Sequence, residues 1–183
     1  MAAAPARRPP RLVAAFPEAA AALAACAGRG ATVAVAESCT GGLLGAALTA
    51  VPGSSRVVLG GVIAYSDQVK VTCLRVSEAT LRAQGAVSEA VARQMAVGVA
   101  SRLGASLGVG ITGVAGPGMS EGKPAGLVHV VVVAPWGERV RRLERDLGRE
   151  GTRAAAVTAA LALLLELALP ELARPELARP PAG

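Results

Sequence analysis

The sequence contains very few of the side chains that enzymes most often use for catalysis or for stacking on bases. Aromatic residues make up 2% of the 183 residues, as one Phe, one Tyr and one Trp, and there is one His and no Asn. Without Asn a Cys-His-Asn catalytic set is excluded, and a Ser-His-Asp triad would have to use His129. Three scattered rings also do not form a platform for nucleic-acid bases.

Lysine is almost absent as well, since 17 of the 19 basic residues are Arg and only Lys70 and Lys123 are Lys. Arginine therefore supplies nearly every position that needs only a positive charge, which makes the two lysines informative. A net charge of +6 is compatible with an anionic ligand or nucleic acid, but the charges are dispersed along the chain. We interpret them mostly as a diffuse Arg-rich surface, and nucleic acid is not an expected partner.

The three cysteines, Cys26, Cys39 and Cys73, have no CxxC spacing and lie in apolar surroundings. An odd, unpatterned count indicates reduced thiols and predicts a cytoplasmic protein. With one His and no paired cysteines, no metal or cofactor is expected. The apolar run from Leu161 to Leu169 contains Glu166 and is far shorter than the roughly 20 residues of a membrane span, so we expect a soluble protein with no membrane partner.

Hydrophobic residues make up 52% of the chain and charged residues 17%, which suits one well-packed domain of this length. Residues 1–10 are predicted to be a disordered Pro/Arg/Ala leader and residues 11–169 the domain. Residues 170–183 contain Pro-Glu-Leu-Ala-Arg twice and are interpreted as a low-complexity tail.

Within the domain, β-branched runs alternate with Ala-rich segments, which predicts alternating strands and helices. The Val-rich run at 127–134 is typical of a strand buried on both faces. Five strands interleaved with helices predict an α/β fold, a three-layer α/β/α domain with a mixed sheet. We expect strands at 32–36, 57–65, 107–111, 127–134 and 139–147, and helices at 12–27, 43–50, 67–74, 78–84, 88–103 and 152–169.

The segment Ala-Glu-Ser-Cys-Thr-Gly-Gly at 36–42 lies where a strand is expected to end and a helix to begin. Ligands of open α/β sheets bind at such positions. Small hydroxyl residues followed by glycines let backbone N–H groups approach an anion at the helix N-terminus. A capped turn without any ligand is the alternative. The Lys-Ser/Thr of a P-loop is missing, so that motif is excluded.

The only Tyr and one of the two Lys residues, Tyr65 and Lys70, lie five residues apart across a predicted strand-to-helix junction. Tyr65 can be a core ring with a solvated hydroxyl, and Lys70 can be a surface charge. However, a surface charge in this chain is nearly always Arg, and a Lys amine can lose its proton when it is desolvated, which Arg cannot. We therefore favour a functional Lys70.

The last two candidate regions are a Gly-rich loop and the start of the final helix. The loop runs over 112–118 and continues to 123–126, and it offers the Thr112 hydroxyl, several N–H groups and the second Lys, although an ordinary wide loop is the alternative. Arg149 and Arg153 can bind a phosphate together with the helix end, or lie in solvent. His129 lies within the Val-rich strand, where we interpret it as a packed histidine.

These segments occur in an order that resembles a known family, the CinA C-terminal domain family of nicotinamide-nucleotide amidases (PncC). The resemblance covers about residues 12–169. It rests on Ala-Glu-Ser-Cys-Thr-Gly-Gly (36–42), Pro-Gly-Ser-Ser (52–55), Gly-Gly-Val-Ile-Ala-Tyr-Ser (60–66) with Lys70, Gly-Ala-Val-Ser-Glu (85–89), Thr-Gly-Val-Ala-Gly-Pro-Gly (112–118) and Lys-Pro-Ala-Gly (123–126).

The resemblance implies hydrolysis of the carboxamide of nicotinamide mononucleotide to nicotinate mononucleotide and ammonia, in pyridine-nucleotide salvage. On the matching positions Ser38 is implied as the nucleophile and Lys70 as its base, so we expect the Lys70 amine within about 3.5 Å of the Ser38 hydroxyl. Tyr65 and Thr112 are implied as auxiliary polar groups. Backbone N–H groups of 38–42 and 113–116 are the candidate oxyanion donors. The expected substrate-binding residues are Thr40, Gly41, Gly42, Gly113, Gly116, Arg149 and Arg153, and a homodimer or larger assembly is expected.

The chain departs from the family pattern in three places. The stretch before Lys123 is short, His129 stands where an aromatic residue is common, and we find no N-terminal molybdopterin-binding-like domain, whose activity is therefore not expected. Two other functions stay open. One is a non-catalytic, competence- or DNA-damage-associated partner-binding module, and the other is a Ser-Lys hydrolase of another small amide.

Overall fold

A mixed five-stranded sheet in the order β2-β1-β3-β4-β5 forms the middle layer of the protein. The computed structural model describes residues 12–169, so the predicted leader and tail lie outside the described residues. β1 pairs in parallel with β2 and β3, whereas β4 is antiparallel to both β3 and β5. The strands are β1 (Val33–Glu37), β2 (Val58–Ile63), β3 (Leu107–Gly113), β4 (Leu127–Ala134) and β5 (Gly137–Glu144).

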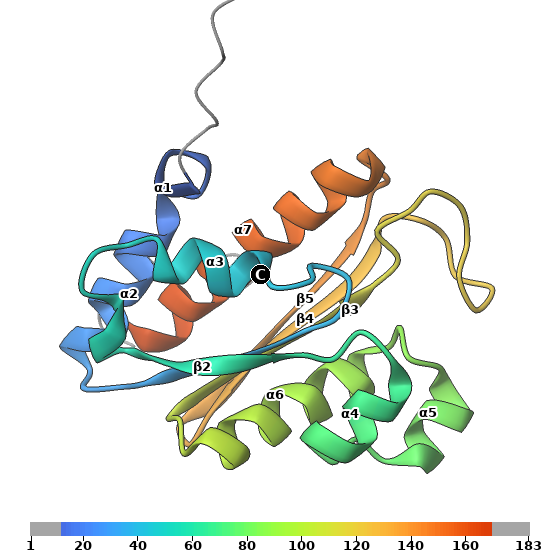
Figure 1. Cartoon of the computed structure of the whole chain (residues 1–183), viewed down its shortest axis with the longest axis horizontal. Helices are drawn as coiled ribbons and strands as arrows, with labels where there is room; N and C mark the ends of the chain where they lie inside the picture. The colour runs from blue at the N-terminus through green and yellow to red at the C-terminus, as the bar shows by residue number, and fades with distance from the viewer. Residues whose placement is uncertain (1–11, 170–183) are drawn as a thin grey trace, which may run out of the picture.

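Helices cover both faces of this sheet, which confirms the predicted three-layer α/β/α architecture (Figure 1). One face carries α1 (Leu12–Ala15), α2 (Glu18–Gly28), α3 (Leu43–Thr49) and α7 (Gly148–Ala168). The other face carries α4 (Asp67–Leu74), α5 (Glu78–Gln84) and α6 (Glu89–Leu103). A short 3₁₀ helix, η1 (Ser54–Arg56), joins α3 to β2.

Helix α6 lies unusually close to the sheet because two positions of β3 have no side chain. A Cβ at Gly108 would come within 2.0 Å of the Ala96 carbonyl oxygen, and a Cβ at Gly110 equally close to that of Ala92. Since real Cβ atoms do not approach an oxygen so closely, only glycine permits this contact. The α6 backbone therefore packs directly on β3.

Helix α7 is long and apolar enough to cross a membrane by length and composition. Its apolar face instead packs on the sheet and on α2, and 56% of its most apolar window is buried. Leu161, Leu163, Leu164 and Leu167 are all almost completely buried in the main core. Core packing accounts for the apolar character of this helix.

The predicted boundaries differ most from the structure in the first helix and around the start of the last helix. The helix expected over 12–27 is divided into α1 and α2 at Pro17, which has no N–H to donate and disfavours helical backbone at the buried Phe16 before it. The last strand ends at Glu144, which pairs with Leu127, and α7 begins about one turn earlier than expected. The early start of α7 is supported by Thr152, whose hydroxyl accepts a hydrogen bond from the Leu147 N–H at 3.3 Å.

The carboxyl ends of β1, β2 and β3 meet at one edge of the sheet. From β1 the chain passes through α3 to β2 on one side, and from β2 it returns through α4, α5 and α6 on the opposite face to β3. The chain thus leaves β1 and enters β3 on opposite faces. In α/β proteins a crevice for ligands opens at such a switch point.

Candidate active site

A cavity of about 280 Å³ opens at this switch point, between the carboxyl ends of β1 and β3. All four residues implied as catalytic line it: Ser38, Tyr65, Lys70 and Thr112. Gly113, Gly116 and Arg149 of the expected substrate-binding set line it as well. The remaining members of that set, Thr40, Gly41, Gly42 and Arg153, lie outside the lining.

Ser38 is the first residue after β1, and both sides of its turn are fixed. Its own N–H donates to the Ile111 carbonyl of β3 at 2.9 Å. The preceding residue, Glu37, is buried, and its carboxylate accepts three N–H groups at the start of α3. These come from Gly42 at 3.0 Å, Leu44 at 3.1 Å and Gly45 at 2.8 Å. The buried carboxylate therefore caps α3 and holds the turn that carries Ser38.

Arg153 holds the same turn from α7. The Thr40 carbonyl accepts hydrogen bonds from both Nε and Nη2 of Arg153, at 3.2 and 2.7 Å. This guanidinium is thus committed to the protein backbone. Thr40 itself is completely buried, and its hydroxyl has no hydrogen-bond partner among the described residues.

Gly41 and Gly42 form the turn through left-handed backbone, with φ of +59° and +93°. The Gly41 N–H donates to the Ser38 carbonyl at 3.0 Å, and the Gly42 N–H is used by Glu37. Neither amide is therefore free to bind an oxyanion. The Cys39 N–H donates to no acceptor in the described part of the chain, and Cys39 lines the cavity.

Cys39 is the only residue in the lining with a thiol, but the structure makes it a poor nucleophile. Burial raises the pKa of this thiol to about 12, and the nearby negative charge of Glu37 adds to the effect. The reactive form of cysteine is the thiolate, which is scarce at neutral pH when the pKa is so high. Of the adjacent pair, Ser38 is the better candidate for chemistry.

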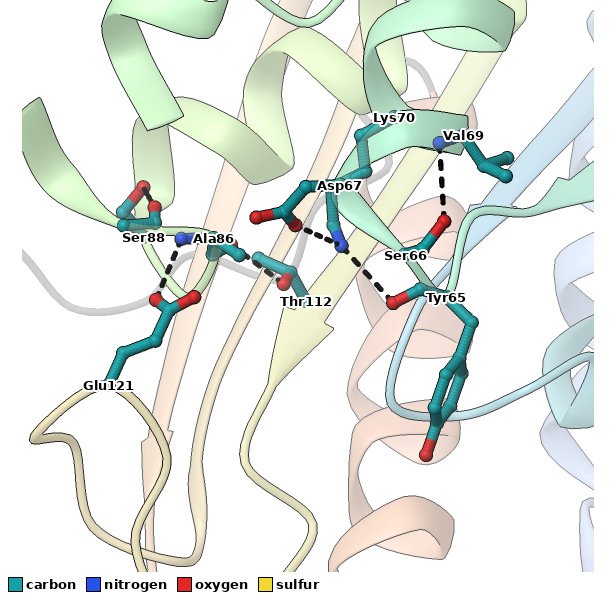
Figure 2. Close-up of polar contacts among 10 residues, drawn as sticks. Tyr65, Ser66, Asp67, Val69, Lys70, Ala86, Ser88, Thr112 and Glu121 are labelled. Carbon is teal, nitrogen blue, oxygen red and sulfur yellow. Dashed lines mark hydrogen bonds and ion pairs between the residues drawn. The ribbon is translucent and has the colours of Figure 1, made fainter. Parts of the chain in front are cut away.

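Lys70 is one of the largest side chains in the protein to be fully buried, at 2% exposure. It lies on α4, which begins after Ser66, whose hydroxyl accepts the Val69 N–H at 3.4 Å. Figure 2 shows its amine between Asp67 and the Tyr65 carbonyl, to which it donates hydrogen bonds of 3.0 and 3.5 Å. No hydrogen bond joins this amine to Ser38 within residues 12–169. The expected hydrogen bond between Lys70 and Ser38 is therefore not formed in this arrangement, in which the amine donates to Asp67 and the Tyr65 carbonyl.

The opposite wall of the cavity is the turn before α6, and three side chains fasten it to the β3–β4 region. The Thr112 hydroxyl donates to the Ala86 carbonyl at 2.9 Å, and Glu121 accepts the Ala86 N–H at 2.9 Å (Figure 2). Lys123 donates to the carbonyls of Gln84 and Val87, at 2.5 and 2.7 Å. The second lysine thus fixes this wall and does not itself line the cavity.

Arg149 is the arginine that lines the cavity. Its Nη1 donates to the Gly116 carbonyl and its Nη2 to the Tyr65 hydroxyl, each at 2.9 Å. Tyr65 is 60% exposed, so its ring is not a core residue. The N–H groups of Ala115 and Gly116 donate to no described acceptor, and both residues line the cavity, as Cys39 does.

His129 lies on β4 opposite Thr112 in register, but it does not line the cavity. Burial lowers the pKa of this imidazole, and the nearby positive charge of Arg142 adds to the effect. Its Nδ1 is buried without a hydrogen-bond partner among the described residues. Within residues 12–169 no group of three His, Cys, Asp or Glu side chains is placed to hold a metal ion.

Three carboxylates that shape the site, Glu37, Asp67 and Glu121, were not among the residues predicted from the sequence. Glu37 had a usable signal, because a lone charge at the end of an apolar run must find buried partners. Asp67 and Glu121 had none, since their contacts with Lys70 and Ala86 depend on the fold.

The fold and the cavity together define a three-layer α/β domain with a cavity lined by polar residues at the switch point of its sheet. The family model of the CinA C-terminal domain matches residues 17–168. The chain belongs to the CinA C-terminal domain family.

Relatives in sequence include a CinA-like protein of Thermosynechococcus vestitus, 53% identical over 137 residues, which are 73% of this chain and 33% of that protein. A CinA-like protein of Frankia casuarinae is 48% identical over 136 residues, covering 74% of this chain and 31% of that protein. The chain therefore spans about a third of the length of the curated relatives it matches.

Solved structures of the same family match over most of their length. The competence/damage inducible protein CihA of Agrobacterium tumefaciens is 40% identical with a TM-score of 0.80, and the match covers 87% of this chain and 96% of that one. A CinA superfamily protein of Klebsiella pneumoniae is 34% identical with a TM-score of 0.81, covering 84% and 97%. These names refer to competence and damage and specify no reaction.

Proposed function

We propose that this domain is an amidase that hydrolyses the carboxamide of nicotinamide mononucleotide to nicotinate mononucleotide and ammonia. The observation that carries the proposal is a buried lysine, Lys70, lining the same cavity as a serine, Ser38, at a strand-to-helix turn. Burying an amine costs free energy, because the charged form loses its hydration. A role as a catalytic base explains why a lysine is kept at such a position. The order of the family motifs supports the choice of substrate.

In the proposed reaction the Ser38 hydroxyl attacks the carboxamide carbon while the Lys70 amine takes its proton. For this the amine must be neutral and must turn from Asp67 toward Ser38. The carbonyl oxygen becomes an oxyanion, for which the N–H groups of Cys39, Ala115 and Gly116 are the candidate donors. Collapse of the intermediate breaks the C–N bond and returns the proton to the leaving nitrogen, which departs as ammonia. Water then hydrolyses the acyl-serine ester to give the carboxylic acid.

Arg149 is proposed to hold the 5′-phosphate, because its guanidinium lines the cavity and has no carboxylate partner among the described residues. Arg153 is proposed to act indirectly: it binds the Thr40 carbonyl and so fixes the turn that carries Ser38. A soluble substrate of this kind suits a cytoplasmic enzyme, and we propose that location and a homo-oligomeric state with it.

A second function is favoured by one observation, the competence- and damage-related names of the relatives. A partner-binding module would use the exposed surface and would have no need for Ser38 or Lys70. A Ser-Lys hydrolase of another small amide would need both residues but would release no ammonia from nicotinamide mononucleotide.

The test is ammonia release from nicotinamide mononucleotide by the wild type, Ser38→Ala and Lys70→Arg. Loss of the nucleophile should lower kcat by about 10³-fold or more. Arg keeps the charge of Lys70 but cannot supply a neutral amine, so a loss of about 10²–10⁴-fold is expected. Ser101→Ala, on the exposed surface of α6, is the matched control and should leave the rate unchanged. Full activity of Lys70→Arg would refute the proposed base, and an inactive wild type would favour the other two functions.

A further inference from the structure

Four charged side chains line the cavity: Asp67, Lys70, Glu121 and Arg149. Asp67 and Lys70 form an ion pair of 3.0 Å and largely cancel each other. Neither Glu121 nor Arg149 forms an ion pair with any described residue. One carboxylate and one guanidinium in the lining therefore have no ion-pair partner among the described residues.

The negative charge is held in a fixed position. One oxygen of Glu121, Oε2, accepts the Ala86 N–H at 2.9 Å, while Oε1 accepts no hydrogen bond from a described residue. The Lys123 amine is close to this carboxylate, since a Cβ at Gly85 would contact both. The amine donates to the carbonyls of Gln84 and Val87 and forms no ion pair with Glu121. Glu121 thus presents an oriented carboxylate oxygen that remains available to a ligand.

The positive charge lies at the start of α7. Arg149 is bound to the Gly116 carbonyl and the Tyr65 hydroxyl, both neutral acceptors, so its charge is not cancelled. In Figure 2, Glu121 and Tyr65 lie on opposite sides of Thr112. Arg149 is bound to the Tyr65 hydroxyl, whereas Glu121 is bound to the Ala86 N–H, so the two charges are held by different parts of the cavity lining.

We propose that this cavity selects a zwitterionic ligand, with Glu121 facing a positively charged ring and Arg149 facing an anionic group. The inference rests on the proposed function and deepens it, because a pyridinium nucleotide carries both charges. It makes Glu121 a specificity-determining residue that distinguishes a cationic ring from a neutral ring of the same shape. A carboxylate that is already oriented attracts the cation without further ordering.

The size of the effect follows from the exposure of Glu121, which leaves its charge partly screened by solvent. A screened carboxylate near a cation changes affinity by about three- to tenfold, and added salt reduces the effect. Glu121 also supports the wall through Ala86, so a purely structural role must be separated from recognition. Glu121→Gln does this, because the amide oxygen can still accept the Ala86 N–H while the charge is lost.

The experiment measures binding by calorimetry in a Ser38→Ala background, where the ligand is not consumed. The probes are nicotinamide mononucleotide and its reduced dihydropyridine form, which has the same carboxamide, ribose and phosphate but a neutral ring. Adding Glu121→Gln should weaken binding of the cationic form about fivefold, leave the neutral form within about twofold, and show a smaller difference at high salt. Glu166→Gln, which removes a carboxylate paired with Arg141 outside the cavity, is the matched control and should change neither affinity.

An equal loss of affinity for both probes would show that Glu121 has only a structural role, and this result would overturn the inference. The inference would also be overturned if neither probe lost affinity, or if neither probe bound at all. Turnover by the wild type is measured separately. Discrimination between the probes without ammonia release would refute the proposed reaction and leave the inference standing. Ammonia release without a difference in affinity between the two probes would refute the inference and leave the proposed reaction standing.

Discussion

The buried carboxylate of Glu37 offers the sharpest test of how the Ser38 turn is held. In Glu37→Gln one carboxylate oxygen becomes an NH₂ group, which cannot accept a hydrogen bond. The less harmful orientation keeps the oxygen that accepts two N–H groups, from Gly42 and Leu44, and replaces the one that accepts from Gly45. The Gly45 N–H then faces another donor in a buried site.

The expected cost can be worked out from these contacts. Losing one charge-assisted hydrogen bond and leaving its donor unsatisfied costs about 1.5–3 kcal/mol. Removing the negative charge from the N-terminus of α3 adds about 0.5–1 kcal/mol. The variant should therefore be less stable by about 2–4 kcal/mol, which for a domain of this size lowers Tm by roughly 5–12 °C.

The measurement is urea unfolding followed by circular dichroism, with a parallel thermal scan. Glu78→Gln is the matched control, because Glu78 also lies in the first turn of a helix but is exposed and paired only with Arg82. Its effect should stay within about 0.5 kcal/mol. If Glu37→Gln were no more destabilising than this control, Glu37 would not hold the turn.

The two arginines at the start of α7 and the single histidine give two further predictions. Arg149→Ala should raise KM for nicotinamide mononucleotide with little change in Tm. Arg153→Ala should lower both Tm and kcat, because the Thr40 carbonyl loses both of its Arg153 donors. An equal change in Tm for the two variants would contradict this assignment of roles. Burial lowers the pKa of His129 in the folded protein, so below about pH 6.5 the unfolded chain binds a proton more readily than the folded one. The stability of the fold that is present above this pH is therefore lost as the pH falls. His129→Phe should therefore show a smaller fall in Tm between pH 7.5 and pH 5.5 than the wild type, and an unchanged fall would exclude His129 as its source.

The parts of the fold that depend on local chemistry were predictable from the sequence. Ser77 and Ser88 are residue types that favour helix N-caps, and they cap α5 and α6 by accepting an N–H three residues ahead. Gly104 ends α6 in left-handed backbone. The α/β class followed from the alternation of apolar strands and helices. Local patterns were sufficient here because the residues that decide them are neighbours in the chain.

The contacts that complete the site were not predictable in the same way. Arg153 binds the Thr40 carbonyl across 113 residues of sequence, and no pattern distinguishes that arginine from Arg149. The Lys70 amine donates to Asp67, one turn earlier on α4, and not to Ser38 within the described residues. Which of several polar partners a side chain chooses is decided by packing, which the sequence pattern does not contain.

The close contact between α6 and β3 has a consequence for the width of the cavity. Helix α6 begins at Glu89, directly after the wall segment that holds Ala86 and Val87. A methyl group at Gly110 would have to push the helix away from the sheet, because the Ala92 carbonyl already occupies that space. The wall would move with the helix. The width of the cavity therefore depends on Gly110, a position within the sheet that does not line the cavity.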